Sequence, residues 1–261
     1  MSTEYDKFKK ECDKEIEAQG NDEEFLDVTK AWFASANKSK YSYHFEWLGR
    51  PVIQYPQDLM AMQEIIWRVK PDLIIETGIA HGGSLIFSAS MLKLLDSCET
   101  PPAVHDNDET ATSRLVLGID IDIRSHNQRA LDNHPMSRSI RMIQGSSIDA
   151  DIIGQVHDIA SAYKNILVCL DSNHTHEHVL AELEAYAGLV TAGSYCVVFD
   201  TVIDDMPADT FSNRPWGPGN NPKTAAKEFL KNHVEFEIDK SVQNRYMITA
   251  APDGFLRRAS V

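Results

Sequence analysis

The chain has 261 residues, of which 43% are hydrophobic, and this is enough for one α/β core with an extension. Lysine and arginine total 25 against 39 aspartates and glutamates, so the formal net charge is −14. Nucleic acid is excluded as an expected partner, because a phosphate-binding surface is basic. No apolar run reaches the roughly 20 residues of a membrane-spanning helix, and the charged opening segment lacks the apolar stretch of a secretory signal. We therefore expect a cytoplasmic protein with no membrane partner.

The N-terminal part is expected to form a helical and aromatic cap. Its first 40 residues are polar and charged, and an aromatic segment with two prolines follows, a change typical of helices that lead into an extended connector. Beyond it, apolar residues recur near helical spacing until Pro71. We therefore expect a cap over residues 1–56 and a single domain over residues 57–261. Five aromatic residues of the cap are expected to pack internally or at a homo-oligomer interface rather than in a substrate pocket: Trp32, Tyr41, Tyr43, Phe45 and Trp47.

The domain is predicted to contain a doubly wound sheet. Helix-length segments separate several short, β-branched apolar runs, a pattern typical of a parallel sheet covered on both faces. These runs are residues 72–78, 114–122, 139–145, 165–172 and 194–201. Residues 233–258 predict two more strands joined by a short polar turn. The expected fold is α/β: a Rossmann-like, mostly parallel seven-stranded sheet with an antiparallel C-terminal hairpin and an N-terminal helical extension.

Two loops interrupt this pattern. Residues 96–113 are polar and acidic and predict an exposed loop, to which we assign no function. Residues 204–222 contain four prolines and a tryptophan on the side where the strands end, and ligands of open α/β sheets bind beside that edge. This loop is either a rigid surface loop or a lid over a substrate, with Trp216 as an apolar wall and Asn220 as a polar contact.

A turn follows the first expected strand, and its spacing indicates the kind of ligand. Glu76, Gly78, Gly82 and Ser84 form the pattern ExGxxxGxS and not the GxGxxG of a dinucleotide fold. The glycines are expected to let the backbone approach a ligand, and the next helix offers free N–H groups. An acid here repels a pyrophosphate but suits an ammonium or a sulfonium. The turn therefore favours S-adenosylmethionine over a dinucleotide.

Polar residues also end the second and third expected strands. Asp120 can accept hydrogen bonds from both hydroxyls of a ribose, although an aspartate at a strand end is equally often a helix cap. Ser146 and Ser147 follow the third strand and can hold an adenine edge or act as N-caps.

The fourth and fifth strand ends carry acids and a histidine. Asp171 and His174 are spaced to reach one bound substrate, whereas His176 and His178 are expected on the next helix. Asp171 and Asp200 can share a hard cation such as Mg²⁺ or another divalent ion, because oxygen ligands suit it. A histidine can also accept a proton near neutral pH.

Several long segments resemble the cephalosporin hydroxylase family, the CmcI-like proteins, within the class I methyltransferases. They are residues 47–67, 70–92, 169–186, 193–201 and 214–225. Despite its name, this family implies the methyltransferase fold and S-adenosylmethionine. The resemblance extends over the chain from about Tyr43 to Arg257.

The resemblance also implies roles for individual residues. The methionine end of the cofactor would lie at Glu76, Gly78, Gly82 and Ser84, its ribose at Asp120, and its adenine at Ser146 or Ser147. Asp171 and Asp200 would be metal ligands, and His174 would be the general base. Relatives commonly present two adjacent ligands after the fifth strand, whereas this chain has Phe199, Asp200 and Thr201. The third ligand therefore stays unassigned.

The residues and the resemblance together predict an S-adenosylmethionine-dependent O-methyltransferase with a small hydroxylated natural product or sugar as substrate. The sulfonium is already an activated methyl donor, so the protein must orient an acceptor oxygen and remove its proton. Mg²⁺ at Asp171 and Asp200 would lower the pKa of the acceptor hydroxyl. One alternative is a metal-dependent hydroxylase that uses His174, His176 and Asp171. The other is a non-catalytic, methyltransferase-like partner subunit.

Overall fold

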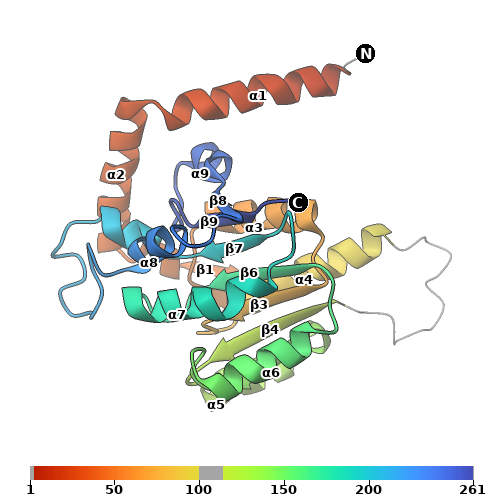
Figure 1. Cartoon of the computed structure of the whole chain (residues 1–261). Helices are drawn as coiled ribbons and strands as arrows, with labels where there is room; N and C mark the ends of the chain where they lie inside the picture. Colours follow the sequence, from red (N-terminus) through yellow and green to blue (C-terminus); the bar gives the residue numbers. More distant parts are fainter. Residues whose placement is uncertain (1–2, 100–113, 261) are drawn as a thin grey trace.

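A seven-stranded sheet forms the centre of the computed structural model, which describes residues 3–99 and 114–260 (Figure 1). The strand order is β5-β4-β3-β6-β7-β9-β8, with β3 to β7 parallel and β9 antiparallel to both of its neighbours. The strands are β3 (Leu73–Thr77), β4 (Leu115–Asp120), β5 (Ile140–Gln144), β6 (Ile166–Leu170), β7 (Tyr195–Val198), β8 (Phe236–Ile238) and β9 (Phe255–Arg258). The predicted mostly parallel sheet of seven strands is confirmed.

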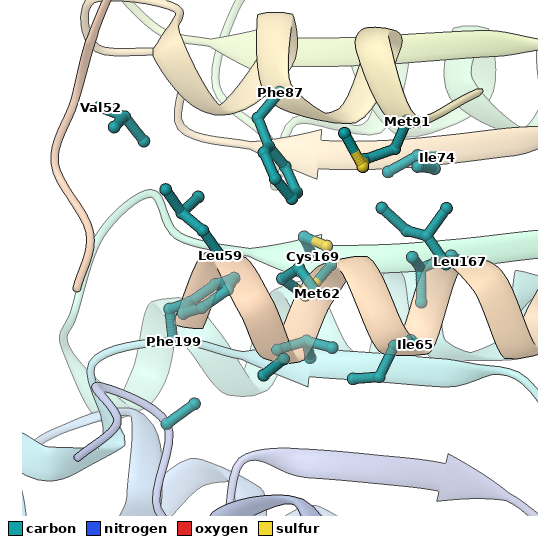
Figure 2. Close-up of a cluster of buried hydrophobic side chains, with 14 of the residues drawn as sticks. Val52, Leu59, Met62, Ile65, Ile74, Phe87, Met91, Leu167, Cys169 and Phe199 are labelled. Atoms are coloured by element: carbon teal, nitrogen blue, oxygen red, sulfur yellow. The ribbon is translucent and has the colours of Figure 1, made fainter. Parts of the chain in front are cut away.

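Helices cover both faces of this sheet, because successive strand residues point to opposite sides. Ile74 packs with the helices of one face, and its neighbours Leu73 and Ile75 pack with those of the other. The first face carries α3 (Pro56–Val69), α4 (Gly83–Glu99) and α5 (Ser125–Asp132), and the second carries α6 (Ala150–Ala160), α7 (His176–Tyr186) and α8 (Pro222–Phe229). Figure 2 shows part of the first core, with Leu59, Met62, Ile65, Phe87 and Met91 gathered around Ile74, Leu167 and Cys169.

The N-terminal segment adds two helices and a small hairpin to this domain. Its elements are α1 (Glu4–Gly20), α2 (Glu23–Lys38), η1 (Tyr41–Tyr43), β1 (Phe45–Trp47) and β2 (Arg50–Val52). Four of the five aromatic residues highlighted in the sequence pack against the core, and Tyr43 is the exposed exception. Rings of Trp32 and Phe33 meet Tyr55 with centroids 5.8 and 5.2 Å apart, which fixes α2 beside the start of α3.

The first helix, α1, lies across one end of the molecule and projects beyond it (Figure 1). Thr3 and Asp6 form a capping box at its N-terminus. At its C-terminal end the Gln19 amide donates to the backbone carbonyls of Asn244 and Arg245 in α9 (Lys240–Tyr246). None of the described helices is long and apolar enough to span a membrane.

The C-terminal hairpin is present, but the predicted short turn within it is wrong. β8 and β9 pair antiparallel, and α9 and an irregular segment separate them along the chain. Asp239 caps α9 by accepting from the N–H of Ser241, which ends the first strand early. In the irregular segment, the Thr249 hydroxyl and the Ala250 N–H donate to the buried carboxylate of Asp58 in α3. This partner lies far away in the sequence, so local periodicity could not indicate it.

The loop predicted over residues 96–113 is also altered in the described part. Residues 96–99 continue α4, and the remaining residues lie outside the described part of the chain. Arg114, directly before β4, pairs with Asp96 and Glu99 of α4 and fixes the end of this helix beside the start of the strand.

Candidate active site

The predicted site residues gather at one edge of the sheet. β4, β3, β6 and β7 are consecutive in the strand order, so their carboxyl ends lie together. The N–H of Asp171 donates to the Thr77 carbonyl at 2.9 Å, and the N–H of Phe199 donates to the Leu170 carbonyl at 3.0 Å. The parallel ladders therefore extend to the acids themselves and fix their backbones relative to one another.

The glycines of the turn after β3 are required by the protein's own packing. Gly78 has φ +90°, and a Cβ placed on it would meet the Asp171 carbonyl oxygen at 2.0 Å. Gly82 has φ +80°, and its Cβ would meet the Leu131 side chain at 2.6 Å. The sequence suggested that these glycines let the backbone approach a ligand, and Gly78 does line two cavities. The structure adds a packing reason, because the glycines let β3 close against β6 and α4 against α5.

Asp120 holds this turn in place from the end of β4. Its Oδ2 accepts hydrogen bonds from the N–H groups of Ile79 (2.8 Å) and Ala80 (3.2 Å), and its Oδ1 accepts from Asp122 (3.0 Å). Asp120 also lines a cavity of about 280 Å³, which we call the β4-side cavity. Its lining is Gly78, Ile119, Asp120, Ile121, Ser146, Ser147, Ser172, Asn173, His178 and Trp216.

A buried carboxylate that the sequence did not single out lies behind the serines of this cavity. Glu182 is fully buried, and its Oε1 accepts from the hydroxyls of Ser147 and Ser172, both at 2.6 Å. The ring Nε2 of His178 lies 3.1 and 3.2 Å from the same two hydroxyls. Among the described residues, the second oxygen of Glu182 has no hydrogen-bond partner. The spacing of His178 and Glu182, one helical turn apart, is the sequence signal that could have indicated this pair.

Glu76 and Ser84 contact each other across the turn. The Ser84 hydroxyl donates to the Glu76 carboxylate, which is 4% exposed. Burial raises the pKa of Glu76 to about 7, although the hydrogen bond from Ser84 lowers it. Ser84 lines a small cavity of about 40 Å³ together with Gly78, Gln54 and Asp171. A cation bound in this cavity would favour the charged form of Glu76.

Asp171, His174 and Asp200 form a compact cluster, and one ligand atom from each lies within 4.8 Å of the others. His174 Nε2 lies 3.1 Å from Asp200 Oδ2. Burial, and then the charges of Asp200 and Glu76, raise the pKa of Asp171 well above its ordinary value, while a hydrogen bond from Gln54 lowers it. Two carboxylates this close repel each other, and a divalent cation would remove that repulsion. The donor set therefore fits a metal ion, with His174 as the third candidate donor.

The other acids and the threonine near β7 do not belong to this cluster. Asp204 accepts hydrogen bonds from the Gly219 N–H and the Asn221 amide, and Asp205 pairs with Lys223 at 2.6 Å. Thr201 donates its hydroxyl to the Pro252 carbonyl. These groups stabilise the segment after β7. Asp200 is therefore the residue that this segment contributes to the cluster.

His176 is also directed away from the cluster, as the sequence suggested. Its Nδ1 lies 2.9 Å from the Thr224 hydroxyl, and its Nε2 lies 3.3 Å from Glu228, both in α8. The set of two histidines and one carboxylate that the hydroxylase alternative needs is therefore not assembled from Asp171, His174 and His176.

The loop over residues 204–222 brings Trp216 to the cluster. Its ring meets the His174 ring edge-on, with centroids 4.9 Å apart. Asn220, expected to contact a substrate, instead fixes the loop. Its side chain accepts from the N–H of His176 at 2.9 Å and donates to the Pro215 carbonyl at 2.8 Å. Both ends of its amide are thus already bound to protein.

A second cavity, of about 300 Å³, opens on the other side of the cluster, and we call it the β7-side cavity. His174, Asp200 and Trp216 line it from the domain. Its other walls come from the N-terminal segment (Asn37, Lys40, Ser42, Tyr43, Ile53, Gln54, Tyr55) and from later segments (Val202, Ile203, Met206, Thr210, Phe211, Arg214, Ala250). Sequence reasoning had assigned the cap to packing, so the contribution of Gln54, Tyr43 and Tyr55 to this cavity was missed.

Solved structures with the same architecture include CmcI with Mg and SAM and an O-methyltransferase from Bacillus cereus with SAH. The CmcI structure has a TM-score of 0.54 and 17% sequence identity, covering 84% of this chain and 78% of that one. The B. cereus structure has a TM-score of 0.50 and 12% identity, covering 80% and 81%. At these identities the likeness establishes the fold.

Sequence comparison identifies the family. The rhamnosyl O-methyltransferase of Mycobacterium bovis (strain BCG / Pasteur 1173P2) is 30% identical over 206 residues, which are 77% of this chain and 73% of that protein. The rhamnosyl O-methyltransferase of Mycobacterium leprae (strain TN) is 29% identical over 213 residues, covering 81% and 82%. Residues 39–259 match the family model described as Rhamnosyl O-methyltransferase/CmcI, and the chain therefore belongs to this family, as its motifs predicted.

Proposed function

We propose that this protein is an S-adenosylmethionine-dependent, metal-assisted O-methyltransferase that acts on a hydroxyl of a sugar or another small natural product. The observation that carries the proposal is the position of the Asp171, His174 and Asp200 cluster. His174 and Asp200 line the β7-side cavity, and Asp171 lines the small cavity at Ser84. Ser172 and Asn173, which directly follow Asp171, line the β4-side cavity, and Trp216 is a wall of both larger cavities. The names of the relatives support the same activity, because they are rhamnosyl O-methyltransferases.

The proposed cofactor site is the β4-side cavity together with the small cavity at Ser84, since Gly78 lines both. Asp120 would hold the ribose, Ser146 and Ser147 the adenine, and the turn with Glu76 and Ser84 the methionine end. Glu76 supports this placement, because its pKa of about 7 leaves it partly neutral until a cation such as the ammonium lies nearby. When bound, S-adenosylmethionine supplies a sulfonium methyl group as the electrophile.

The cluster beside it is the proposed metal site, with Asp171 and Asp200 as carboxylate ligands. Gln54 hydrogen-bonds to Asp171 and orients it. A divalent cation at these ligands would lower the pKa of an acceptor hydroxyl and fix its position.

His174 is the proposed general base. It lines the β7-side cavity and lies 3.1 Å from Asp200, whose charge would stabilise the imidazolium. His174 would accept the proton of the acceptor hydroxyl, whose oxygen would take the methyl group that S-adenosylmethionine would supply. Trp216 packs against the imidazole ring and limits its rotation.

Calorimetric titration with S-adenosylmethionine, followed by transfer of its labelled methyl group to methyl rhamnoside, tests this function. We expect binding to a single site and formation of a methyl ether. Absence of cofactor binding would contradict the proposal and favour the non-catalytic alternative. The domain boundary near residue 56, the homo-oligomer and the cytoplasmic location stay predictions.

A further inference from the structure

Two positively charged side chains line the β7-side cavity without a carboxylate partner. Lys40 lies between α2 and η1, Arg214 lies in the loop over residues 204–222, and both are exposed. Neither forms an ion pair with a carboxylate of the described residues. Lys223 and Arg245, by comparison, are already engaged, because Lys223 pairs with Asp205 and Asp253, and Arg245 pairs with Glu64. Lys40 and Arg214 are therefore two cations on the lining of one cavity that can meet an anionic ligand.

The position of Arg214 relates it to the reaction centre. Its guanidinium carbon lies 5.2 Å from the centroid of the Trp216 ring, and the edge of the same ring meets His174. A cation–π contact of this kind holds the guanidinium against the cavity wall and leaves its N–H donors free. One indole ring therefore separates a free bidentate donor from the proposed base.

The lining of this cavity carries charges of both signs. Asp200 lies 3.1 Å from His174, whereas Lys40 and Arg214 supply positive charge. An acceptor with an anionic group would be attracted to the two cations and repelled from the carboxylate. Such a molecule can enter in one orientation, and that orientation selects the hydroxyl that reaches His174.

We infer that the acceptor carries a phosphate ester or diphosphate group, which Arg214 and Lys40 bind while a hydroxyl of the same molecule lies at His174. This inference rests on the proposed function and names its substrate class. Two cations match the charge of a phosphate, and the guanidinium fork matches its geometry. The volume of about 300 Å³ lies at the low end of small-molecule pockets, roughly 300 to 1,000 Å³, which suits a monosaccharide.

The test compares three acceptors that share one sugar: methyl rhamnoside, rhamnose 1-phosphate and a nucleoside-diphosphate-linked rhamnose. We expect kcat/KM to be at least about tenfold higher for one of the phosphorylated acceptors, and the better one distinguishes a sugar phosphate from an activated sugar. Arg214→Gln and Lys40→Gln should each lower that value about three- to tenfold and lower the value for methyl rhamnoside less. Added salt should reduce the preference for the phosphorylated acceptor over methyl rhamnoside. Lys231→Gln removes an exposed lysine outside the cavity lining and serves as the matched control.

A binding measurement covers the case in which rhamnose is not the right sugar. In the presence of S-adenosylhomocysteine and EDTA, inorganic pyrophosphate should bind the wild-type protein. The Lys40→Gln/Arg214→Gln double variant should bind it at least about tenfold more weakly, and Lys231→Gln as the wild type does. The inference is overturned if the wild type does not bind pyrophosphate, or if the double variant binds it equally well. Those results leave the proposed function intact if S-adenosylmethionine still binds, whereas loss of cofactor binding contradicts the function itself.

Discussion

The two cavities beside the cluster are built from different kinds of structure. The β4-side cavity is formed by strand ends and the turns that directly follow them, and Asp120 and Glu182 fix these turns through buried hydrogen bonds. The β7-side cavity is formed by a long loop and the N-terminal segment. Loops vary more readily than strand ends. This difference supports the proposal that the β4-side cavity binds the cofactor and the β7-side cavity binds the acceptor.

The largest expected effect comes from His174, which lines the β7-side cavity. His174→Ala should lower kcat by roughly 10²- to 10⁴-fold and leave the affinity for S-adenosylmethionine unchanged, because it removes the proton acceptor. Steady-state kinetics and cofactor calorimetry measure the two quantities.

His176→Ala is the matched control for this variant, since its ring contacts α8 and should leave kcat within about threefold. An unchanged kcat in His174→Ala would remove His174 from the base role. A parallel loss of Mg²⁺ affinity would identify it as the third metal ligand.

A substitution in the β4-side cavity should weaken cofactor binding without changing acceptor binding. Glu182→Gln weakens the acceptor of two serine hydroxyls, so we expect the Kd of S-adenosylmethionine to rise about tenfold while the KM of the sugar stays constant. The neighbouring Glu184→Gln, which removes an exposed carboxylate beside His233, is its control. A larger change in acceptor KM than in cofactor Kd would break the division between the two cavities.

Trp216 is the residue that both cavities share, and its replacement should affect both sides. We expect Trp216→Ala to raise cofactor Kd and acceptor KM by about three- to tenfold each, since it removes a common wall. Trp216→Phe should restore most of the loss, because a ring edge still meets His174. An effect on one ligand alone would show that the wall belongs to one cavity.

The expected effect furthest from the reaction concerns the pH dependence of folding stability. Burial raises the pKa of Asp58 to about 7, against the lowering hydrogen bonds from Ala250 and Thr249. The folded state therefore holds a proton that the unfolded state releases near pH 4, so stability should fall as pH rises from about 4 to 7. The slope for this group is at most about 1.4 kcal/mol per pH unit.

Asp58→Asn should reduce that slope in urea denaturation measured at several pH values. Glu76 has a pKa raised in the same direction and accounts for part of what remains. A slope equal to that of the wild type would mean that Asp58 is charged in the folded protein. Asp209→Asn, an exposed aspartate in the loop after η5 (Thr201–Asp205), is the control.

Prediction from the sequence succeeded where polar residues directly follow a strand. The apolar runs before Asp120, Asp171 and Asp200 predicted both the strands and their ends, and parallel strands necessarily bring such ends to one edge. The turn that contains Gly78 and Gly82 was also predicted, because it directly follows a predicted strand. Its physical cause is packing against Asp171 and Leu131, which a linear sequence cannot reveal.

Prediction failed where contacts join distant segments. Gln54 reaches Asp171 from the end of the N-terminal segment, and Asp58 binds residues 249–250, so neither partner is visible from local pattern. Asn220 looked like a polar substrate contact because its partners, a turn carbonyl and the start of α7, depend on how the loop folds. Unsatisfied polar groups can be counted only once the chain is folded.

The central claim is that Asp171 and Asp200 hold a divalent ion between a bound cofactor and an acceptor. Calorimetric titration of Mg²⁺ into the protein saturated with S-adenosylmethionine tests it most directly. The account predicts one binding site that Asp171→Asn and Asp200→Asn each abolish and that Asp209→Asn leaves unchanged. Absence of Mg²⁺ binding, or equal binding in all three variants, would contradict it.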